Sequence, residues 1–168
     1  MKLVSLDSIF DFEYGNKFDL NKMIKAKSPE DAVSFIGRSG RDNGVTAYVG
    51  RLADIEPYSS GLVTVALGGA ILSSFVQPRP FYTGQNLAVL KPKEKMALEE
   101  KLYYCLCIQQ NRHRYGAFGR EANRTLRKLL LPERSEIPNW VQESLEVVCA
   151  EWKNSVDQIL TPERWNNF

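Results

Sequence analysis

Short apolar runs separated by polar turns fill the chain from residue 10 to residue 92. The runs are rich in valine, isoleucine, phenylalanine and tyrosine, and most are four to six residues long, which is typical of strands. The predicted strands are Asp11–Tyr14, Val33–Ile36, Val45–Val49, Leu62–Leu67, Ile71–Val76 and Phe81–Leu90. Six short strands at this spacing favour a small curled sheet or half-barrel.

Glycine and asparagine mark the turns between these runs. Asn43-Gly44 tolerates the positive φ of a tight turn, and Gly68-Gly69 reverses the chain after Leu67. After the first strand, Lys17–Ile24 has the composition of a partly helical insertion. Arginine and amide side chains gather in several of these turns, so the rim of the sheet carries most of the candidate chemistry.

The pattern becomes helical after Pro92. One apolar face is predicted from residues at helical spacing, namely Leu98, Leu102, Cys105 and Leu106. Further along, Leu126–Pro132 favours a helix by composition, but a short run stopped by proline is equally typical of a buried strand. The sequence leaves both alternatives open for that segment.

A second helix is predicted to begin at Pro138-Asn139 and to end at Thr161-Pro162. Its apolar residues recur every three or four positions and form a narrow stripe: Val141, Leu145, Val148, Trp152, Val156 and Ile159. A stripe this narrow is close to a coiled-coil seam. It fits packing on the sheet domain as well as binding to a helix of another chain.

Together these elements predict a mixed α/β (α+β) fold. We expect a small curled β-sheet or half-barrel with flanking helices, followed by one C-terminal spacer-type helix. Pro132–Pro138 is the only plausible boundary, so the predicted units are a recognition domain at residues 1–134 and a helical unit at residues 135–168.

Composition narrows the classes of function. The 168 residues carry a net charge of only +2, but seven Lys and Arg face two acidic residues between positions 111 and 134, and six acidic residues face two cations after position 134. This asymmetry indicates two faces with different partners, or simply two solvated surfaces. No apolar run is long enough to span a membrane, and no secretory signal is expected at the N-terminus. Cys105, Cys107 and Cys149 have no framework spacing, which favours a reducing cytosol and buried structural thiols.

The sequence lacks the residues that most classes of enzyme need for catalysis. The sequence holds no methyltransferase motif, no dinucleotide fingerprint and no phosphate-binding loop, and His113 is the only histidine, so metal sites built from several His and Cys are excluded. Two Glu-x-Lys triplets, Glu99–Lys101 and Glu151–Lys153, match a fragment of a Mg²⁺-dependent nuclease site. Both lie in predicted helices, where such a metal cluster does not usually assemble.

Five stretches resemble the target-recognition domain of DNA-specificity (S) subunits from type I and related type IIB/IIG restriction-modification systems. They are, in order, LDSIFDFEYGNKFDLNKM, FIGRSGRDNGVTAYV, GLVTVALGGAILSSFVQPRPFYTGQNLAVLKP, RYGAFGREANRTLRKLLLP and PNWVQESLEVV. The last is more similar to the type IIB/IIG continuation than to the type I one. The resemblance covers nearly the whole chain.

This resemblance implies a non-catalytic, cytoplasmic subunit that binds double-stranded DNA sequence-specifically and directs a separate DNA methyltransferase (modification) subunit. It implies no cofactor and no metal. Typical specificity subunits carry two recognition domains and two long helices, whereas this sequence has one of each. A half-subunit that forms a homodimer through the C-terminal stripe, an orphan and a diverged relative are the alternatives.

Candidate DNA contacts follow from the turn chemistry, because glycine turns approach a duplex closely and arginine presents planar donors to phosphates and guanine edges. They are Lys17, Arg38, Ser39, Arg41, Asn43, Gln77, Arg79, Tyr82, Arg112, Arg114, Tyr115 and Arg120. We expect most to contact phosphate and only Arg41, Asn43, Gln77 or Arg79 to read bases. For each residue, an ordinary surface role is the alternative.

Three functions therefore compete. The first is a DNA-binding specificity module. The second is a non-catalytic interaction or regulatory protein that retains the recognition fold without binding DNA. The third is the Mg²⁺-dependent nuclease suggested by the Glu-x-Lys triplets.

Overall fold

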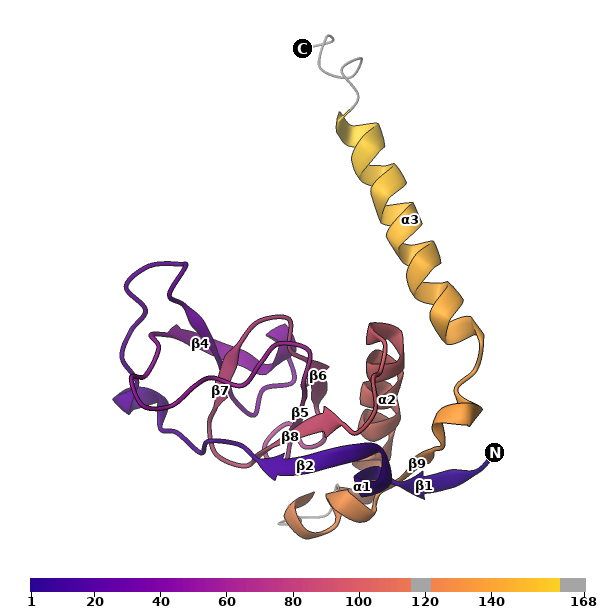
Figure 1. Cartoon of the computed structure of the whole chain (residues 1–168), viewed down its shortest axis with the longest axis horizontal. Coiled ribbons are helices and arrows are strands. Elements are labelled where there is room, and N and C mark those ends of the chain that lie inside the picture. Colours follow the sequence, from indigo (N-terminus) through magenta and orange to yellow (C-terminus); the bar gives the residue numbers. More distant parts are fainter. Residues whose placement is uncertain (116–121, 161–168) are drawn as a thin grey trace.

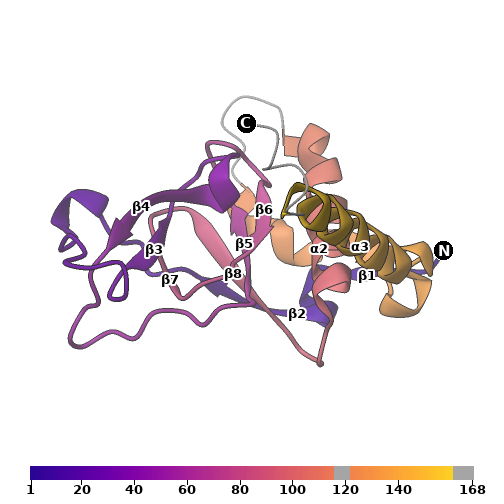
Figure 2. The same ribbon diagram turned by 90° about the horizontal axis from the view of Figure 1, so that it is seen from above.

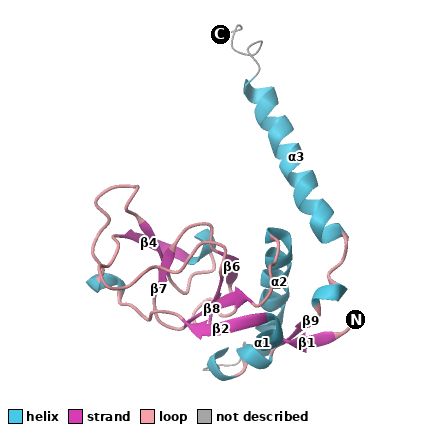
Figure 3. Ribbon diagram, viewed as in Figure 1, coloured by secondary structure: helices cyan, strands magenta, loops and turns pink. Residues whose placement is uncertain are grey.

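The computed structural model describes residues 1–115 and 122–160, with the backbone alone for residues 124 and 155–160 (Figure 1). The strands are β1 (Leu3–Ser5), β2 (Phe10–Tyr14), β3 (Val33–Ile36), β4 (Val45–Val49), β5 (Val63–Ala66), β6 (Ser74–Val76), β7 (Phe81–Thr83), β8 (Leu87–Pro92) and β9 (Leu130–Pro132). The α-helices are α1 (Leu6–Ile9), α2 (Leu98–Gln110) and α3 (Trp140–Leu160). Figure 3 shows most strands in one half of the molecule, and α2 and α3 in the other half together with β1 and β9. This confirms the predicted mixed fold.

Two main sheets form the body. One is antiparallel with the strand order β2-β8-β5-β6, and the other has the order β4-β3-β7, in which β3 and β7 run parallel. A third, two-stranded sheet pairs β1 with β9 and so ties the N-terminus to the segment before α3. In the view from above, the three-stranded sheet lies at one end of the molecule and α2 and α3 at the other (Figure 2).

The central strands of the four-stranded sheet, β5 and β8, are buried on both faces. Val63, Val65 and Leu90 pack into the large core beneath α2, while Ala66, Leu87 and Val89 pack toward the three-stranded sheet. Alternate residues of a strand point to opposite faces, so β5 and β8 have to be apolar almost throughout. This explains why the sequence shows continuous apolar runs there rather than a clean alternation.

One predicted strand, Phe81–Leu90, is wrong as a single element. The chain bends at residues 84–86, where Asn86 adopts a positive φ of 56°. As a result β7 joins the three-stranded sheet and β8 joins the four-stranded sheet. Leu126–Pro132 combines both alternatives left open by its sequence, because a 3-10 turn at Leu126–Lys128 leads into β9.

The predicted apolar face of α2 is also corrected. Tyr104, Cys105 and Ile108 point into the core, whereas Leu98, Leu102 and Leu106 are exposed. The buried face therefore lies to one side of the leucine stripe, and only Cys105 belongs to both. Burial raises the pKa of the Cys105 thiol to about 12, as expected of a structural cysteine.

The other two cysteines differ from it. Cys107 is half-buried. Cys149 on α3 is exposed, so the expectation of a buried thiol is wrong for Cys149. Within the described ranges, no helix has the length and hydropathy needed to cross a bilayer.

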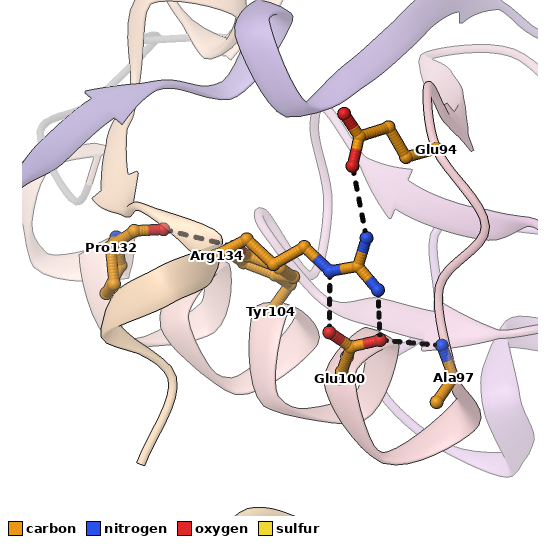
Figure 4. Close-up of polar contacts among 6 residues, drawn as sticks. All are labelled: Glu94, Ala97, Glu100, Tyr104, Pro132 and Arg134. Atoms are coloured by element: carbon orange, nitrogen blue, oxygen red, sulfur yellow. Dashed lines mark hydrogen bonds and ion pairs between the residues drawn. The ribbon is translucent and has the colours of Figure 1, made fainter.

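An ion pair joins α2 to the segment that leads into α3 (Figure 4). Arg134 donates from Nε to Glu100 Oε1 at 2.7 Å and from Nη2 to Glu100 Oε2 at 2.9 Å, and Glu100 Oε2 also accepts from the Ala97 backbone N–H at 2.8 Å. Glu100 is buried, so its charge depends on these donors. Hydrogen bonding to Arg134 is the main cause that holds the pKa of Glu100 below its ordinary value.

We expect Glu100→Gln to lower the free energy of unfolding by about 2 kcal/mol at neutral pH, because Arg134 loses a bidentate charged partner. A carboxyl with a lowered pKa stabilises the fold above its ordinary pKa, and that contribution is lost as pH falls through the lowered value. The difference between variant and wild type should therefore shrink in acid. Urea unfolding at neutral pH and in a series of acidic buffers measures both effects.

Glu94→Gln is the matched control. Glu94 contacts the same guanidinium at 3.2 Å, but its side chain is 79% exposed, so its loss should cost less than about 0.5 kcal/mol. Equal destabilisation by the two variants would contradict the assignment of the Glu100–Arg134 pair as the dominant contact.

Candidate nucleic-acid interface

The loop between β3 and β4, residues 37–44, is the first part of the candidate site, and we call it the arginine loop. Its ends are closed by a hydrogen bond from Gly37 N to Gly44 O at 2.8 Å and another from Gly44 N to Arg41 O at 2.8 Å. Asn43 and Gly44 have φ values of 53° and 77°, which confirms the turn predicted from this dipeptide. A Cβ on Gly44 would lie 3.2 Å from Ile36 Cγ2, so glycine suits this position for space as well as for φ.

A second turn packs directly against the arginine loop. Gly69 has a φ of 65°, and the following Ala70 donates its N–H to Arg38 O at 3.1 Å. A Cβ on Gly40 would lie 3.2 Å from Ser73 Oγ. The predicted turn after β5 therefore holds one side of the arginine loop in place.

The third predicted segment joins the same turn from the end of α2. Arg112 lies in the 3-10 turn Asn111–Tyr115 and donates from Nε to Ile71 O at 2.9 Å and from Nη2 to Ser73 Oγ at 3.0 Å. Arg114 follows on the same turn and is exposed. Arginines far apart in the sequence thus meet around residues 69–73.

Arg79 borders the other end of the arginine loop. Asn43 O accepts a hydrogen bond from Gln77 Nε2 at 2.9 Å, which ties the loop to the segment after β6. Asn43 and Arg79, together with Tyr48, then line a hollow of about 640 Å³. We call the set Arg38, Arg41, Asn43, Arg79, Arg112 and Arg114 the arginine rim.

Lys17 follows β2 at one end of the four-stranded sheet. Its Nζ lies 5.2 Å from the centre of the Tyr14 ring, and the Tyr14 hydroxyl donates to Asn123 O at 2.9 Å. Residues 122 and 123 reach the turn after β5, since Ala122 N donates to Leu67 O at 3.1 Å. Lys17 therefore shares its end of the sheet with the Gly69 turn.

Two predicted contacts are corrected by burial. Gln77 is 1% exposed, and its amide nitrogen donates to Asn43 O and Thr64 Oγ1. Tyr82 is 0% exposed, and its hydroxyl donates to Ile55 O at 2.7 Å and accepts from Leu52 N at 3.1 Å. Neither side chain stands on an exposed loop, because both strand ends are covered by neighbouring segments. Both residues position the loops instead.

The remaining candidates have mixed surroundings. Ser39 Oγ accepts from Arg41 N at 3.1 Å and so supports the arginine loop internally. Tyr115 is half-buried, and its hydroxyl accepts from Thr125 Oγ1 at 3.2 Å. Arg120 lies outside the described residues.

The arginines of this site have no carboxylate partners among the described residues. Some cations elsewhere among those residues are paired, such as Lys2 with Glu133 at 2.7 Å and Arg51 with Glu56 at 3.7 Å. No such partner lies within 4.0 Å of Arg38, Arg41 or Arg79 in the described part of the chain. Uncompensated guanidinium groups on a shared surface attract an external anion.

Sequence reasoning missed Tyr48 as a member of this surface. The alternation along β4 carried the signal, since Val45, Ala47 and Val49 face inward and Tyr48 is 56% exposed between them. Tyrosine is enriched at binding interfaces, so a tyrosine on the exposed face of a strand indicates a contact surface.

The Glu-x-Lys triplets gain no support. Lys101 Nζ donates to Gly61 O at 2.9 Å, which fixes it away from any shared site with Glu99. Within residues 1–115 and 122–160, no group of three His, Cys, Asp or Glu side chains is arranged to hold a metal ion.

The stripe on α3 forms a second, separate surface. Val141 is buried against the body and Leu145 is half-buried, but Val148 is 49% exposed and Trp152 is 73% exposed. The side chains of Val156 and Ile159 lie outside the described set. Figure 1 shows α3 rising away from the body, so packing on the sheet domain accounts for its first turns only.

Known proteins share this fold. The chain is similar to the S subunit of a type I restriction-modification system from M. genitalium, with a TM-score of 0.58 and 13% identity over 79% of this chain and 34% of that one. It is also similar to the HsdS subunit from Thermoanaerobacter tengcongensis, with a TM-score of 0.57 and 15% identity over 99% of this chain and 40% of that one.

A third structure was solved in work on complex assembly and conformational transition of the type I R-M system. It has a TM-score of 0.57 and 16% identity over 98% of this chain and 43% of that one. This chain thus spans less than half the length of all three.

No curated protein sequence matches the chain. A family model, however, matches residues 1–129, which include β1 to β8, α2 and the arginine rim described above. That model describes the DNA specificity domain of type I restriction-modification systems. The chain therefore belongs to the family of type I restriction modification DNA specificity domains.

Proposed function

We propose that this chain recognises double-stranded DNA through the arginine rim and directs a separate methyltransferase to the bound site. The observation that carries the proposal is the convergence of three sequence-distant segments, each bringing exposed arginines, on one surface. Arg38, Arg41 and Arg79 have no carboxylate partner there within the described residues. Phosphate is the anion that such planar, fixed-charge donors suit best.

Loop architecture supports sequence-specific contacts as well as phosphate contacts. The arginine loop is closed by its own backbone bonds and held at Arg38 O and Asn43 O by neighbouring turns. A loop fixed at both ends presents Arg41 in a defined place without a large ordering cost on binding. Arg41 and Arg79 are our candidates for guanine contacts in the major groove, and Arg112 and Arg114 for phosphate contacts.

The helix α3 has a separate role in this proposal. Residues 1–134 act as the recognition unit, and residues 135–168 provide the contact with a partner. Leu102 and Leu106 of α2 and Val141, Leu145 and Val148 of α3 line an apolar hollow of about 200 Å³. An apolar face of this kind is covered by another helix, from a second copy of the chain or from the methyltransferase subunit.

A symmetric dimer would present two recognition surfaces. Two copies related by a twofold axis through α3 would read a split site with matching halves. In this arrangement the chain is a non-catalytic cytoplasmic subunit that needs no cofactor, and any methylation or cleavage takes place on other polypeptides.

The test is the salt dependence of duplex binding. The five arginines of the arginine rim, each at a phosphate, should give a plot of log binding constant against log salt concentration with a slope of about −4.5. Fluorescence anisotropy with a pool of random duplexes and then with a selected duplex measures the slope and the specificity ratio.

The possible outcomes distinguish the three competing functions. Steep salt dependence together with tighter binding to the selected duplex supports a specificity module. Absence of binding even at low salt would contradict it and favour the interaction protein without DNA. Mg²⁺-dependent nicking of DNA that disappears in the Glu99→Ala or Glu151→Ala variant would instead support the nuclease hypothesis.

A further inference from the structure

A second hollow adjoins the arginine rim on the side of the three-stranded sheet. It measures about 870 Å³, and its lining includes Lys25, Lys27, Tyr48 and Arg79. Tyr48 and Arg79 also line the smaller hollow beside Asn43. The two hollows therefore share a border and form one continuous surface from the arginine loop to Lys27.

Strand pairing holds the backbone at Lys25 in place. Gly50 N donates to Ile24 O at 2.8 Å, and Lys25 forms an antiparallel bridge with Val49. The segment around Lys25 thus lies along the free edge of β4 like a short additional strand. The chain bends from Lys27 onward, and both Lys25 and Lys27 line this hollow.

The charge of this hollow is uncompensated. Its lining contains two lysines and one arginine but no carboxylate. Glu30 and Asp31 follow in the same segment without lining it, and Asp31 accepts a hydrogen bond from Ser28 Oγ. In the described part of the chain, no acidic group lies within 4.0 Å of the charged nitrogens of Lys25, Lys27 or Arg79.

We infer that the DNA interface extends across this hollow, where Lys25 and Lys27 contact backbone phosphates beyond the segment held by the arginine rim. The inference rests on the proposed function and deepens it. A nucleic-acid backbone fits better than a small free anion because the cations are spread along a surface rather than gathered around one point. Arg79 and Tyr48 stand at the junction, where the backbone passes from one hollow to the next.

Because these contacts are electrostatic, they should change affinity for all sequences alike. We expect Lys25→Ala/Lys27→Ala to weaken duplex binding about 10-fold at low salt and to reduce the magnitude of the salt slope by about 2. The ratio of selected to random duplex affinity should stay the same. Fluorescence anisotropy over a salt series measures all three quantities.

Two matched variants control for charge and for folding. Lys91→Ala/Lys95→Ala removes the same charge from exposed positions at the far end of β8 and after it, and it should leave affinity and slope unchanged. Lys25→Arg/Lys27→Arg keeps the charge and should retain wild-type binding. Thermal unfolding of all variants verifies that the fold is intact.

The failure of this inference differs from the failure of the proposed function. If the wild type binds duplex DNA but Lys25→Ala/Lys27→Ala keeps its affinity and slope, the extended interface is overturned and the arginine rim stands. An equal loss in the Lys91/Lys95 control would also overturn it, because the effect would then reflect net charge alone. If the wild type binds no duplex, the proposed function itself fails.

Discussion

The Arg38→Ala/Arg41→Ala double variant is expected to bind its selected duplex about 100-fold less tightly than the wild type, because each arginine at a base edge or phosphate contributes about 1–3 kcal/mol. Arg38 lies against the Gly69 turn and Arg41 at the exposed tip of the same loop. The loop backbone does not depend on either side chain, since its closure uses Gly37, Gly44 and the Arg41 carbonyl. The loss should therefore reflect missing contacts rather than a collapsed loop. Anisotropy titration with selected and random duplexes measures it.

Paired cations provide the control for this variant. Lys2→Ala/Arg51→Ala removes the same formal charge, but both side chains already have carboxylate partners, Glu133 and Glu56. Removing them frees two acids elsewhere on the surface and should change duplex affinity by less than about twofold. Unchanged binding by the Arg38/Arg41 variant, or an equal loss in the Lys2/Arg51 variant, would reject the arginine rim as the DNA contact.

Val148→Glu/Trp152→Glu is expected to weaken self-association of the chain more than about 100-fold, because two carboxylates would be desolvated in an apolar helix seam. Both side chains are largely uncovered in the single chain, and Trp152 is the more exposed. DNA binding by one recognition unit should persist, since the arginine rim lies on other elements. Sedimentation equilibrium across a range of protein concentrations measures the association constant.

A variant on the opposite side of α3 separates the seam from general charge. On a helical wheel, positions 150 and 154 lie about 180° from the stripe. Ala150→Glu/Asn154→Glu adds the same two charges there and should leave association unchanged, because both residues are exposed. A wild type that stays monomeric at the highest concentration would contradict the homodimer and leave the methyltransferase as the partner for α3.

Much of the fold could be predicted from local pattern. The strands β2, β3, β4 and β5 follow from short β-branched and aromatic runs between turn residues. The Asn43-Gly44 dipeptide likewise indicates a turn with positive φ, and both residues have positive φ in the structure. These features depend on local steric preferences, which act within a few residues. The extent of α3 and its narrow stripe likewise follow from periodicity alone.

The sequence alone did not show which single residues belong to the site. Gln77 and Tyr82 resemble the other polar residues of their segment in sequence, but neighbouring chain covers both. Lys25 and Lys27 appear as ordinary surface charges until the edge of β4 brings them beside Arg79. Burial and proximity depend on which distant segments pack together, and a local pattern does not contain that information.

The sequence by itself determined the strands β2 to β5, the positive-φ turn at Asn43-Gly44, the apolar stripe of α3 and the kind of side chain available for an anion. Only the tertiary structure decided that Phe81–Leu90 divides between two sheets, that Glu100 pairs with Arg134, and which arginines share a surface. The reason is physical: backbone preference acts over a few residues, whereas core packing and ion pairing join residues far apart in the chain.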